Sequence, residues 1–119
     1  MKLYKIISSD RNTEDLILVC GDLRFAESFN DRLFGLIFRK IKNNQGFAIK
    51  GCNSIHTFWM RYKIDVVFLN KNNEIIKIYE SLKQFRMTPA IKNADCVIEF
   101  PEFTINSFLL KIGDKLKII

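Results

Sequence analysis

Residues 58–68 read Phe-Trp-Met-Arg-Tyr-Lys-Ile-Asp-Val-Val-Phe, the most regular stretch of the 119-residue chain. Apolar side chains occupy every second position from Phe58 to Phe68, and the positions between them include Trp59, Arg61, Lys63 and Asp65. Successive side chains of a strand point to opposite faces of its sheet, so this period of two predicts a half-buried β-strand. If the strand does not bend near Lys63, then Arg61, Lys63 and Asp65 form a row on one face.

Short runs rich in isoleucine and phenylalanine recur along the whole chain and are typical of β-strands. The predicted strands are, in order, Leu3–Ile7, Leu16–Cys20, Phe47–Ile49, Thr57–Tyr62, Asp65–Leu69, Ile75–Tyr79, Val97–Phe100 and Leu116–Ile119. Two of them are separated by Asn70-Lys71-Asn72-Asn73, which predicts a hairpin turn because asparagine tolerates a positive φ angle.

Helical patterns are fewer. Ala26, Phe29, Leu33 and Leu36-Ile37 recur at helical spacing, and Ser28 with Asp31 predicts the N-terminal cap of this main helix. A shorter helix is predicted after Thr104 and is expected to end at Gly113. The sequence therefore predicts an all-β fold, mostly β with one main short helix. The architecture expected is a single-domain β-sandwich or small barrel over residues 1–119.

Composition excludes several classes of protein. Hydrophobic residues make up 48% of the chain and charged residues 27%, as in ordinary globular domains, which excludes disorder, collagen-like repeats and coiled coils. The apolar runs are far shorter than the roughly 20 residues that span a bilayer. The N-terminus also lacks the apolar core of a signal peptide. We therefore expect a cytoplasmic protein without membrane contact, unless a leader has been removed.

The cysteine pattern predicts free thiols. Cys20, Cys52 and Cys96 are odd in number and contain no C-x-x-C pair, which argues against a disulfide framework. The three could make a zinc site with His56 on ligand count alone, but a second close pair of ligands is missing. We therefore expect neither a metal nor a cofactor.

The positive charge is concentrated in one part of the sequence. The chain has 19 basic and 13 acidic residues and a net charge of +6. Residues 32–64 contain no Asp or Glu, and their seven basic residues are Arg32, Arg39, Lys40, Lys42, Lys50, Arg61 and Lys63. Either distant acids such as Asp65 and Glu99 pair with this window, or the window forms a pocket or face for an anionic ligand.

The same window carries recognisable motifs. Residues 32–39 read RLFGLIFR, residues 52–69 read CNSIHTFWMRYKIDVVFL, and residues 94–101 read ADCVIEFP. These stretches resemble the R-x-x-G-L-x-x-R, C-x-S-I-H-T-F-x-M-R-F-x-I-D-V-V-F-L and A-x-x-V-L-E-L-P patterns of a bacterial and archaeal family called domain of unknown function 192. Residues 82–86 and 111–114 resemble its L-x-P-W-R and K-V-G-D elements, so the resemblance spans about residues 20–119.

The resemblance implies a mostly β sandwich or barrel of one domain with a short helix, in agreement with the strand pattern. It implies no reaction, because the family has no established activity. Some members of the family are exported. Glycines usual in the family are replaced in this chain by Phe103 and Leu109, which questions any role for a flexible backbone there.

The candidate site residues are charged side chains on motif positions. In a chain that otherwise relies on lysine, the motif arginines favour bidentate partners such as carboxylates or phosphates. Either these arginines hold the fold together with the two acids, or they bind an anionic ligand. The full candidate set is Arg32, Arg39, His56, Arg61, Asp65, Arg86 and Glu99.

His56 is the only side chain expected to titrate near neutral pH. It could act as a general base oriented by Asp65 or Glu99, or it could be a hydrogen-bonded structural residue. The hydroxyls of Ser54 and Thr57 could serve as nucleophiles or as hydrogen-bonding groups at the end of a strand.

The function favoured by the sequence is a small ligand-binding or interaction domain with an Arg/His-lined cleft for a small anionic or carbohydrate-like ligand. One alternative is a hydrolase- or lyase-type enzyme that uses His56 with Asp65 or Glu99. Another is a protein-interaction module with an exposed edge strand or apolar patch. Nucleic acid is not the expected partner, because the window lacks the aromatic and basic pattern of RNA-binding modules and contains no helix-turn-helix.

Overall fold

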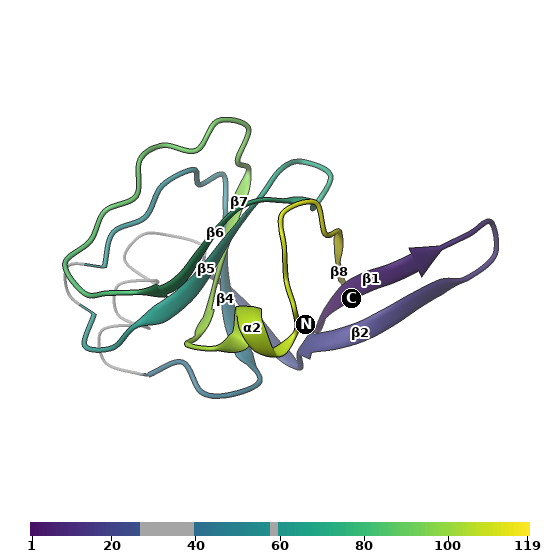
Figure 1. Cartoon of the computed structure of the whole chain (residues 1–119), viewed down its shortest axis with the longest axis horizontal. Coiled ribbons are helices and arrows are strands. Elements are labelled where there is room, and N and C mark those ends of the chain that lie inside the picture. The colour runs from purple at the N-terminus through teal and green to yellow at the C-terminus, as the bar shows by residue number, and fades with distance from the viewer. Residues whose placement is uncertain (27–39, 58–59) are drawn as a thin grey trace.

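The computed structural model describes residues 1–26, 40–57 and 60–119, and it arranges their strands in two sheets (Figure 1). The smaller sheet is antiparallel and has the order β2-β1-β8. Its strands are β1 (Leu3–Ser9), β2 (Glu14–Cys20) and β8 (Leu116–Ile118). The larger sheet has the order β3-β4-β7-β5-β6. Its strands are β3 (Asp22–Ala26), β4 (Gln45–Lys50), β5 (Ile64–Leu69), β6 (Ile75–Leu82) and β7 (Cys96–Pro101).

The two central strands of the larger sheet are buried along their whole length. Every residue of β5 and of β7 is shielded from solvent, which explains why both strands are apolar except for one buried acid each, Asp65 in β5 and Glu99 in β7. β7 lies between β4 and β5 and is antiparallel to both, whereas β3 pairs with β4 in parallel. Cross-strand partners of Glu99 are Phe47 on β4 and Val66 on β5, so these three side chains share one face of the sheet.

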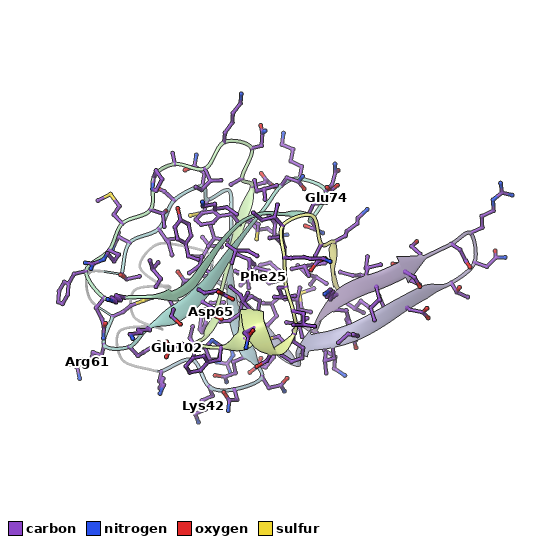
Figure 2. The ribbon with its side chains drawn as sticks, viewed as in Figure 1. Phe25, Lys42, Arg61, Asp65, Glu74 and Glu102 are labelled. Atoms are coloured by element: carbon purple, nitrogen blue, oxygen red, sulfur yellow. The ribbon has the colours of Figure 1, made fainter. Side chains whose placement is uncertain are left out.

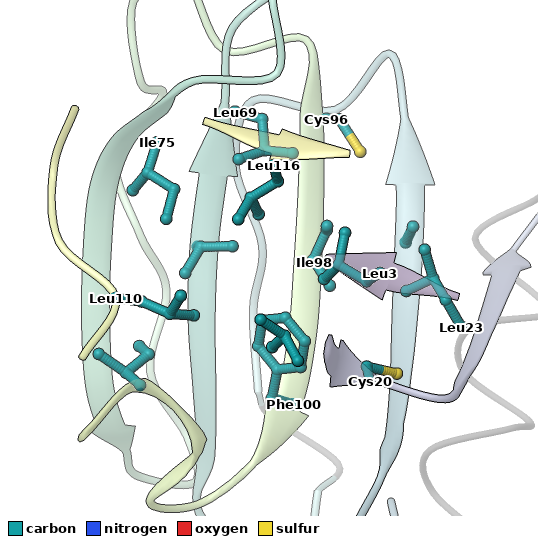
Figure 3. Close-up of a cluster of buried hydrophobic side chains, with 14 residues drawn as sticks. Leu3, Cys20, Leu23, Leu69, Ile75, Cys96, Ile98, Phe100, Leu110 and Leu116 are labelled. Atoms are coloured by element: carbon teal, nitrogen blue, oxygen red, sulfur yellow. The ribbon is translucent and has the colours of Figure 1, made fainter. Parts of the chain in front are cut away.

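Two hydrophobic clusters cover the two faces of the larger sheet. In the first, Leu3 and Leu116 of the smaller sheet join Ile98 and Phe100 of the larger one (Figure 3). In the second, on the opposite face, Val66, Phe68 and Val97 pack with Ile41, Ile55, Met60 and Ile64. The predicted β-rich fold with a short helix is therefore confirmed, and its two sheets share the first cluster.

The predicted hairpin turn joins β5 to β6. Asn73 has a φ angle of 60°. The side-chain Oδ1 of Asn70 accepts hydrogen bonds from the N–H groups of Asn72 and Glu74 at 2.9 and 3.0 Å. The helix predicted after Thr104 is α2 (Thr104–Ser107), and it is shorter than expected. Leu109, at a φ angle of 52°, leaves the helical conformation well before Gly113.

The structure differs from the predicted secondary structure in the segment before β5 and at Ala26. Arg61 and Tyr62 lie in a bend, so the predicted strand Thr57–Tyr62 is not formed by its described residues, and β5 begins at Ile64. The condition for a row of Arg61, Lys63 and Asp65 on one face, a strand without a bend near Lys63, is therefore not met. Ala26, the first residue in the apolar spacing of the predicted main helix, instead ends β3, a strand that the sequence did not predict. The rest of that helix lies outside the described residues.

Candidate functional site

The topology brings three segments to one end of the larger sheet. β4 and β5 begin at this end, and β7 ends there because it runs antiparallel to both. Residues 40–43 therefore approach residues 62–63 and 101–103, although the segments are far apart in the sequence. Figure 2 shows Lys42 and Glu102 at this end of the sheet.

These segments line a cavity of about 490 Å³, here called the lysine groove. Lys40, Lys42 and Lys63 are its cationic residues, and Glu102 is the only acid among the described residues that line it. All three lysines are exposed, and none is within ion-pair distance of a carboxylate in the part of the chain that the structure describes. The groove therefore carries a local excess of positive charge that the described protein does not neutralise.

The groove is anchored by buried structure. Ile41 is 2% exposed and belongs to the second hydrophobic cluster, while its neighbours Lys40 and Lys42 face solvent. The N–H of Ile41 donates a hydrogen bond to the phenol oxygen of Tyr62 at 3.3 Å, and the N–H of Lys42 donates one to Oε1 of Gln45 at 2.9 Å. These contacts hold the lysine-bearing segment against β4 and the chain that leads into β5.

A second cavity of about 380 Å³ adjoins the first and is here called the amide groove. The two cavities share Asn43, Glu102 and Phe103 as lining residues. The other lining residues of the amide groove include Asn44, Gln45, Thr104 and Ser107, and its described lining holds neither Lys nor Arg. A cationic compartment thus lies beside a compartment of amides and hydroxyls.

Phe103 lies on the boundary between the two cavities. Its side chain is 65% exposed and its φ angle is 76°, in the left-handed region that favours glycine. The carbonyl oxygen of Phe103 accepts a hydrogen bond from the N–H of Ser107 at 2.9 Å, which ties it to α2. An aromatic side chain is therefore presented to solvent from a backbone conformation that costs free energy to hold.

Asp65 holds the fold together. It is 1% exposed and lies on the face of the first hydrophobic cluster, opposite Phe100 in the register. Its Oδ1 accepts a hydrogen bond from the N–H of Ser81, and its Oδ2 accepts one from the N–H of Ile105, both at 2.9 Å. One carboxylate therefore joins β5 to β6 and to α2, and both of its oxygens are engaged by backbone groups.

Glu99 lies on the opposite face of the same sheet. It is fully buried and shares its face with Val66 and Phe47. His56 is half-buried with its Nδ1 atom shielded from solvent, and the preceding residue Ile55 belongs to the cluster on this same face. Of the two carboxylates predicted to orient His56, Glu99 is therefore the one on the side of the sheet that His56 occupies.

Arg61 and Arg86, the other candidates that the structure describes, line neither of the two grooves. Arg61 and Arg86 are exposed, and Figure 2 shows Arg61 at the periphery and Asp65 in the interior. Arg32 and Arg39 lie outside the described residues. The structure therefore separates Asp65 from Glu99 and leaves Arg61 and Arg86 on the surface, and the binding role of the predicted set stays a prediction.

Thr57 acts as a hydrogen-bonding group between two loops. It is 1% exposed, and its hydroxyl donates to the carbonyl oxygen of Lys83 at 2.6 Å. The same hydroxyl oxygen accepts a hydrogen bond from the N–H of Arg86 at 3.0 Å, while the carbonyl oxygen of Arg86 accepts one from the N–H of Thr57. These contacts replace the regular ladder that the alternating sequence predicted here.

The cysteines are free thiols, as predicted. Burial raises the pKa of Cys96 to about 11 and also raises the pKa of Cys20, so both thiols stay protonated at neutral pH. The described residues contain no group of three or more His, Cys, Asp or Glu placed to hold a metal ion. They also include no helix of sufficient length and apolarity to cross a membrane.

Comparison with known proteins decides the family. The model of domain of unknown function 192 (DUF192), described as an uncharacterized ACR, matches residues 10–118. The chain belongs to this family. A UPF0127 protein of Pyrococcus furiosus is 33% identical over 100 residues, 81% of this chain and 85% of that protein. A UPF0127 protein of Pyrococcus horikoshii is 34% identical over 101 residues, 82% of this chain and 87% of that protein.

Two solved structures share the fold of this DUF192 chain. One, from Sinorhizobium meliloti 1021, is of a protein to which a role as transcription regulator has been ascribed. It has a TM-score of 0.76 at 17% identity and covers 98% of this chain and 91% of its own. The other is of a protein of unknown function from Novosphingobium aromaticivorans. It has a TM-score of 0.74 at 14% identity, and the match covers 98% of this chain and 84% of that one. At such identities the likeness establishes the fold alone.

The two DUF192 positions where this chain lacks the usual glycine both have left-handed backbones. Phe103 and Leu109 have φ angles of 76° and 52°, so the conformation that glycine would adopt easily is kept by residues with side chains. Leu109 is 72% exposed and its carbonyl oxygen accepts a hydrogen bond from Lys5 Nζ at 3.0 Å. The left-handed backbone conformation is therefore present at both positions, although neither residue is glycine.

Sequence reasoning did not identify the lysine groove as a site. Lys40, Lys42 and Lys63 were counted in the acid-free window, but the choice of candidate residues favoured arginine over lysine. Glu102 and Phe103 lie outside that window and reach it through the antiparallel pairing of β7. The charge window was the available signal, and the order of the strands was the missing information.

The interaction-module alternative also has a structural counterpart. β2 is an edge strand of the smaller sheet, and Figure 1 shows the β1–β2 hairpin extending away from the larger sheet. Ile7, Ile17 and Leu18 on this hairpin are 56%, 42% and 42% exposed. The oligomeric state, which the sequence left open, can be followed by size-exclusion chromatography at several salt concentrations.

Proposed function

We propose that this chain is a small ligand-binding domain whose lysine groove binds a small anionic ligand. The observation that carries the proposal is the convergence of Lys40, Lys42 and Lys63 on one cavity without a described carboxylate paired to them. Like charges around a concavity focus the electric field and raise the local concentration of counter-ions. The cavity of about 490 Å³ has the size of sites for small molecules.

The chemistry of the groove favours compact anions. Lysine ammonium groups are point charges on flexible stems, so they can gather around a tetrahedral phosphate or a carboxylate without a fixed planar geometry. A long polyanion would need a basic surface that continues beyond the groove. Among the described basic residues of the acid-free window, Lys40, Lys42 and Lys63 line the groove, and the chain outside residues 32–64 has a net charge of −1.

The test compares anions at constant ionic strength. Thermal unfolding is followed with sodium phosphate, sugar phosphates and citrate, each against sodium chloride of the same ionic strength, because general screening acts equally in matched solutions. We expect phosphate to raise the unfolding temperature, since a ligand that binds only the folded state stabilises it. The double variant Lys42→Gln/Lys63→Gln should lose this increase.

A matched control separates the groove from general surface charge. Lys71 is exposed in the β5–β6 turn, away from the lining of the groove. The variant Lys71→Gln should therefore keep the full response to phosphate. The proposal is overturned if none of the anions raises the unfolding temperature above its chloride reference. It is equally overturned if Lys71→Gln loses as much of the response as the single variant Lys42→Gln.

A further inference from the structure

The two adjoining cavities form a surface with two chemically different halves. Lys40, Lys42 and Lys63 lie around the lysine groove, whereas the described lining of the amide groove contains no cation. Asn43, Glu102 and Phe103 line both cavities. A ligand that occupies both halves must therefore carry an anionic group at one end and a neutral polar group at the other.

Two polar side chains of the amide groove are available to form hydrogen bonds with a ligand. The Thr104 hydroxyl is committed to the carbonyl oxygen of Pro101 at 2.8 Å, and Gln45 Oε1 accepts the N–H of Lys42. The side-chain amide of Asn43 and the hydroxyl of Ser107 are exposed, and neither forms a hydrogen bond within the described part of the chain. Together they offer donors and acceptors to a neutral polar group of a ligand.

Glu102 limits what can lie at the boundary. Its carboxylate is half-buried and can only accept hydrogen bonds when ionised, so it repels a second anionic group and favours N–H or O–H donors. Phe103 presents its ring at the same boundary with 65% of the side chain exposed. An exposed aromatic ring favours a planar partner that can stack on it.

From this arrangement we infer that the groove takes a nucleoside phosphate. The phosphate is held by the three lysines, the base stacks on Phe103, and donor groups of the nucleoside face Glu102, Asn43 and Ser107. The inference rests on the proposed anion site and specifies its ligand class. It also gives a reason for an aromatic side chain at a left-handed position, because the ring contributes to binding.

The experiment uses isothermal titration of the full chain with inorganic phosphate, ribose 5-phosphate and adenosine 5′-monophosphate (AMP). Stacking of a base on an aromatic ring typically contributes about tenfold in affinity. We therefore expect AMP to bind about tenfold more tightly than ribose 5-phosphate. In Phe103→Gly most of this preference for AMP should be lost, while phosphate binding stays unchanged.

Phe103→Gly is a clean variant because glycine adopts a φ angle of 76° without strain and the removed ring is mostly exposed. Its unfolding temperature, measured without ligand, should not fall below that of the wild type. A second variant, Ser107→Ala, should weaken the binding of AMP and leave the binding of phosphate unchanged, which tests the amide groove separately.

The outcomes are distinct. Equal affinities of the wild type for AMP and ribose 5-phosphate overturn the nucleoside inference and leave the anion site standing. The inference also fails if Phe103→Gly keeps the preference for AMP, because the ring would then not be the stacking partner. Absence of binding for all three ligands overturns the proposed function together with the inference.

Discussion

Asp65→Asn should destabilise the protein severely, because the Asp65 carboxylate is a buried acceptor for two backbone N–H groups. These groups belong to Ser81 and Ile105, and both distances are 2.9 Å. An asparagine has one carbonyl oxygen, so it can satisfy one donor while its NH₂ group faces the other. Asp65 is 1% exposed, and water cannot readily replace the lost acceptor.

The expected magnitude follows from the two contacts. A hydrogen bond to a charged acceptor contributes about 1.5–3 kcal/mol, and a buried donor left without an acceptor costs about 1–3 kcal/mol. Asp65→Asn removes one charged bond outright and converts the other into a neutral one. We therefore expect the free energy of unfolding to fall by about 2–4 kcal/mol, a large share of the total for a domain of this size.

Urea unfolding followed by circular dichroism measures this change. The matched control is Asp95→Asn, because Asp95 is exposed and its carboxylate forms no hydrogen bond with the described residues. The control should change the free energy of unfolding by no more than ~0.5 kcal/mol. If Asp65→Asn is as mild as the control, Asp65 does not join β5 to β6 and α2 as described.

Three further predictions concern other parts of the fold. Leu109→Gly should stabilise the protein by roughly 0.5–1 kcal/mol in urea unfolding, because the relief of left-handed strain exceeds the entropic cost of glycine at this exposed position. A loss of stability would contradict the left-handed backbone at Leu109. Thr57→Val should lower the free energy of unfolding by about 2–3 kcal/mol in the same assay, because the Arg86 N–H and the Lys83 carbonyl oxygen lose the hydroxyl that bonds both. An unchanged urea midpoint would contradict these hydrogen bonds. At about pH 8, a thiol reagent should label half-buried Cys52 before Cys96, whose pKa of about 11 keeps it protonated. Peptide mapping that finds Cys96 labelled first would contradict this order.

Local sequence was sufficient where burial or turn chemistry decides the structure. β5 and β7 were recognised as strands because their buried positions are rich in β-branched and aromatic residues, although the alternating pattern had predicted that β5 is buried on one face only. The turn after β5 was recognised because Asn70 and Asn73 supply the acceptor and the positive φ angle that it needs. These features depend on a few adjacent residues.

Prediction failed where distant contacts decide the structure. The alternating pattern up to Tyr62 is compatible with a strand, but the Thr57 hydroxyl bonds the backbone at Lys83 and Arg86, and the chain bends before β5. β3 was missed because five residues that pair in parallel with β4 carry little local signal. Neither contact leaves a trace in the nearby sequence.

The candidate site was limited by the same difficulty. Asp65 and Glu99 are both charged residues in predicted strands, and the sequence did not reveal that they lie on opposite faces of one sheet. The acid-free window correctly marked where positive charge gathers. The lysines of this window lie close to Glu102 and Phe103 because of the strand order β4-β7-β5, and this order is known only from the three-dimensional structure.

The most direct test of the anion site is a titration of the ¹⁵N-labelled protein with inorganic phosphate, followed by amide chemical shifts. The lysine groove predicts that the largest changes occur at residues 40–43, 62–63 and 102–103, and that they saturate together. Changes centred instead on Arg86, or an absence of saturating changes in the groove, would contradict the proposed binding site.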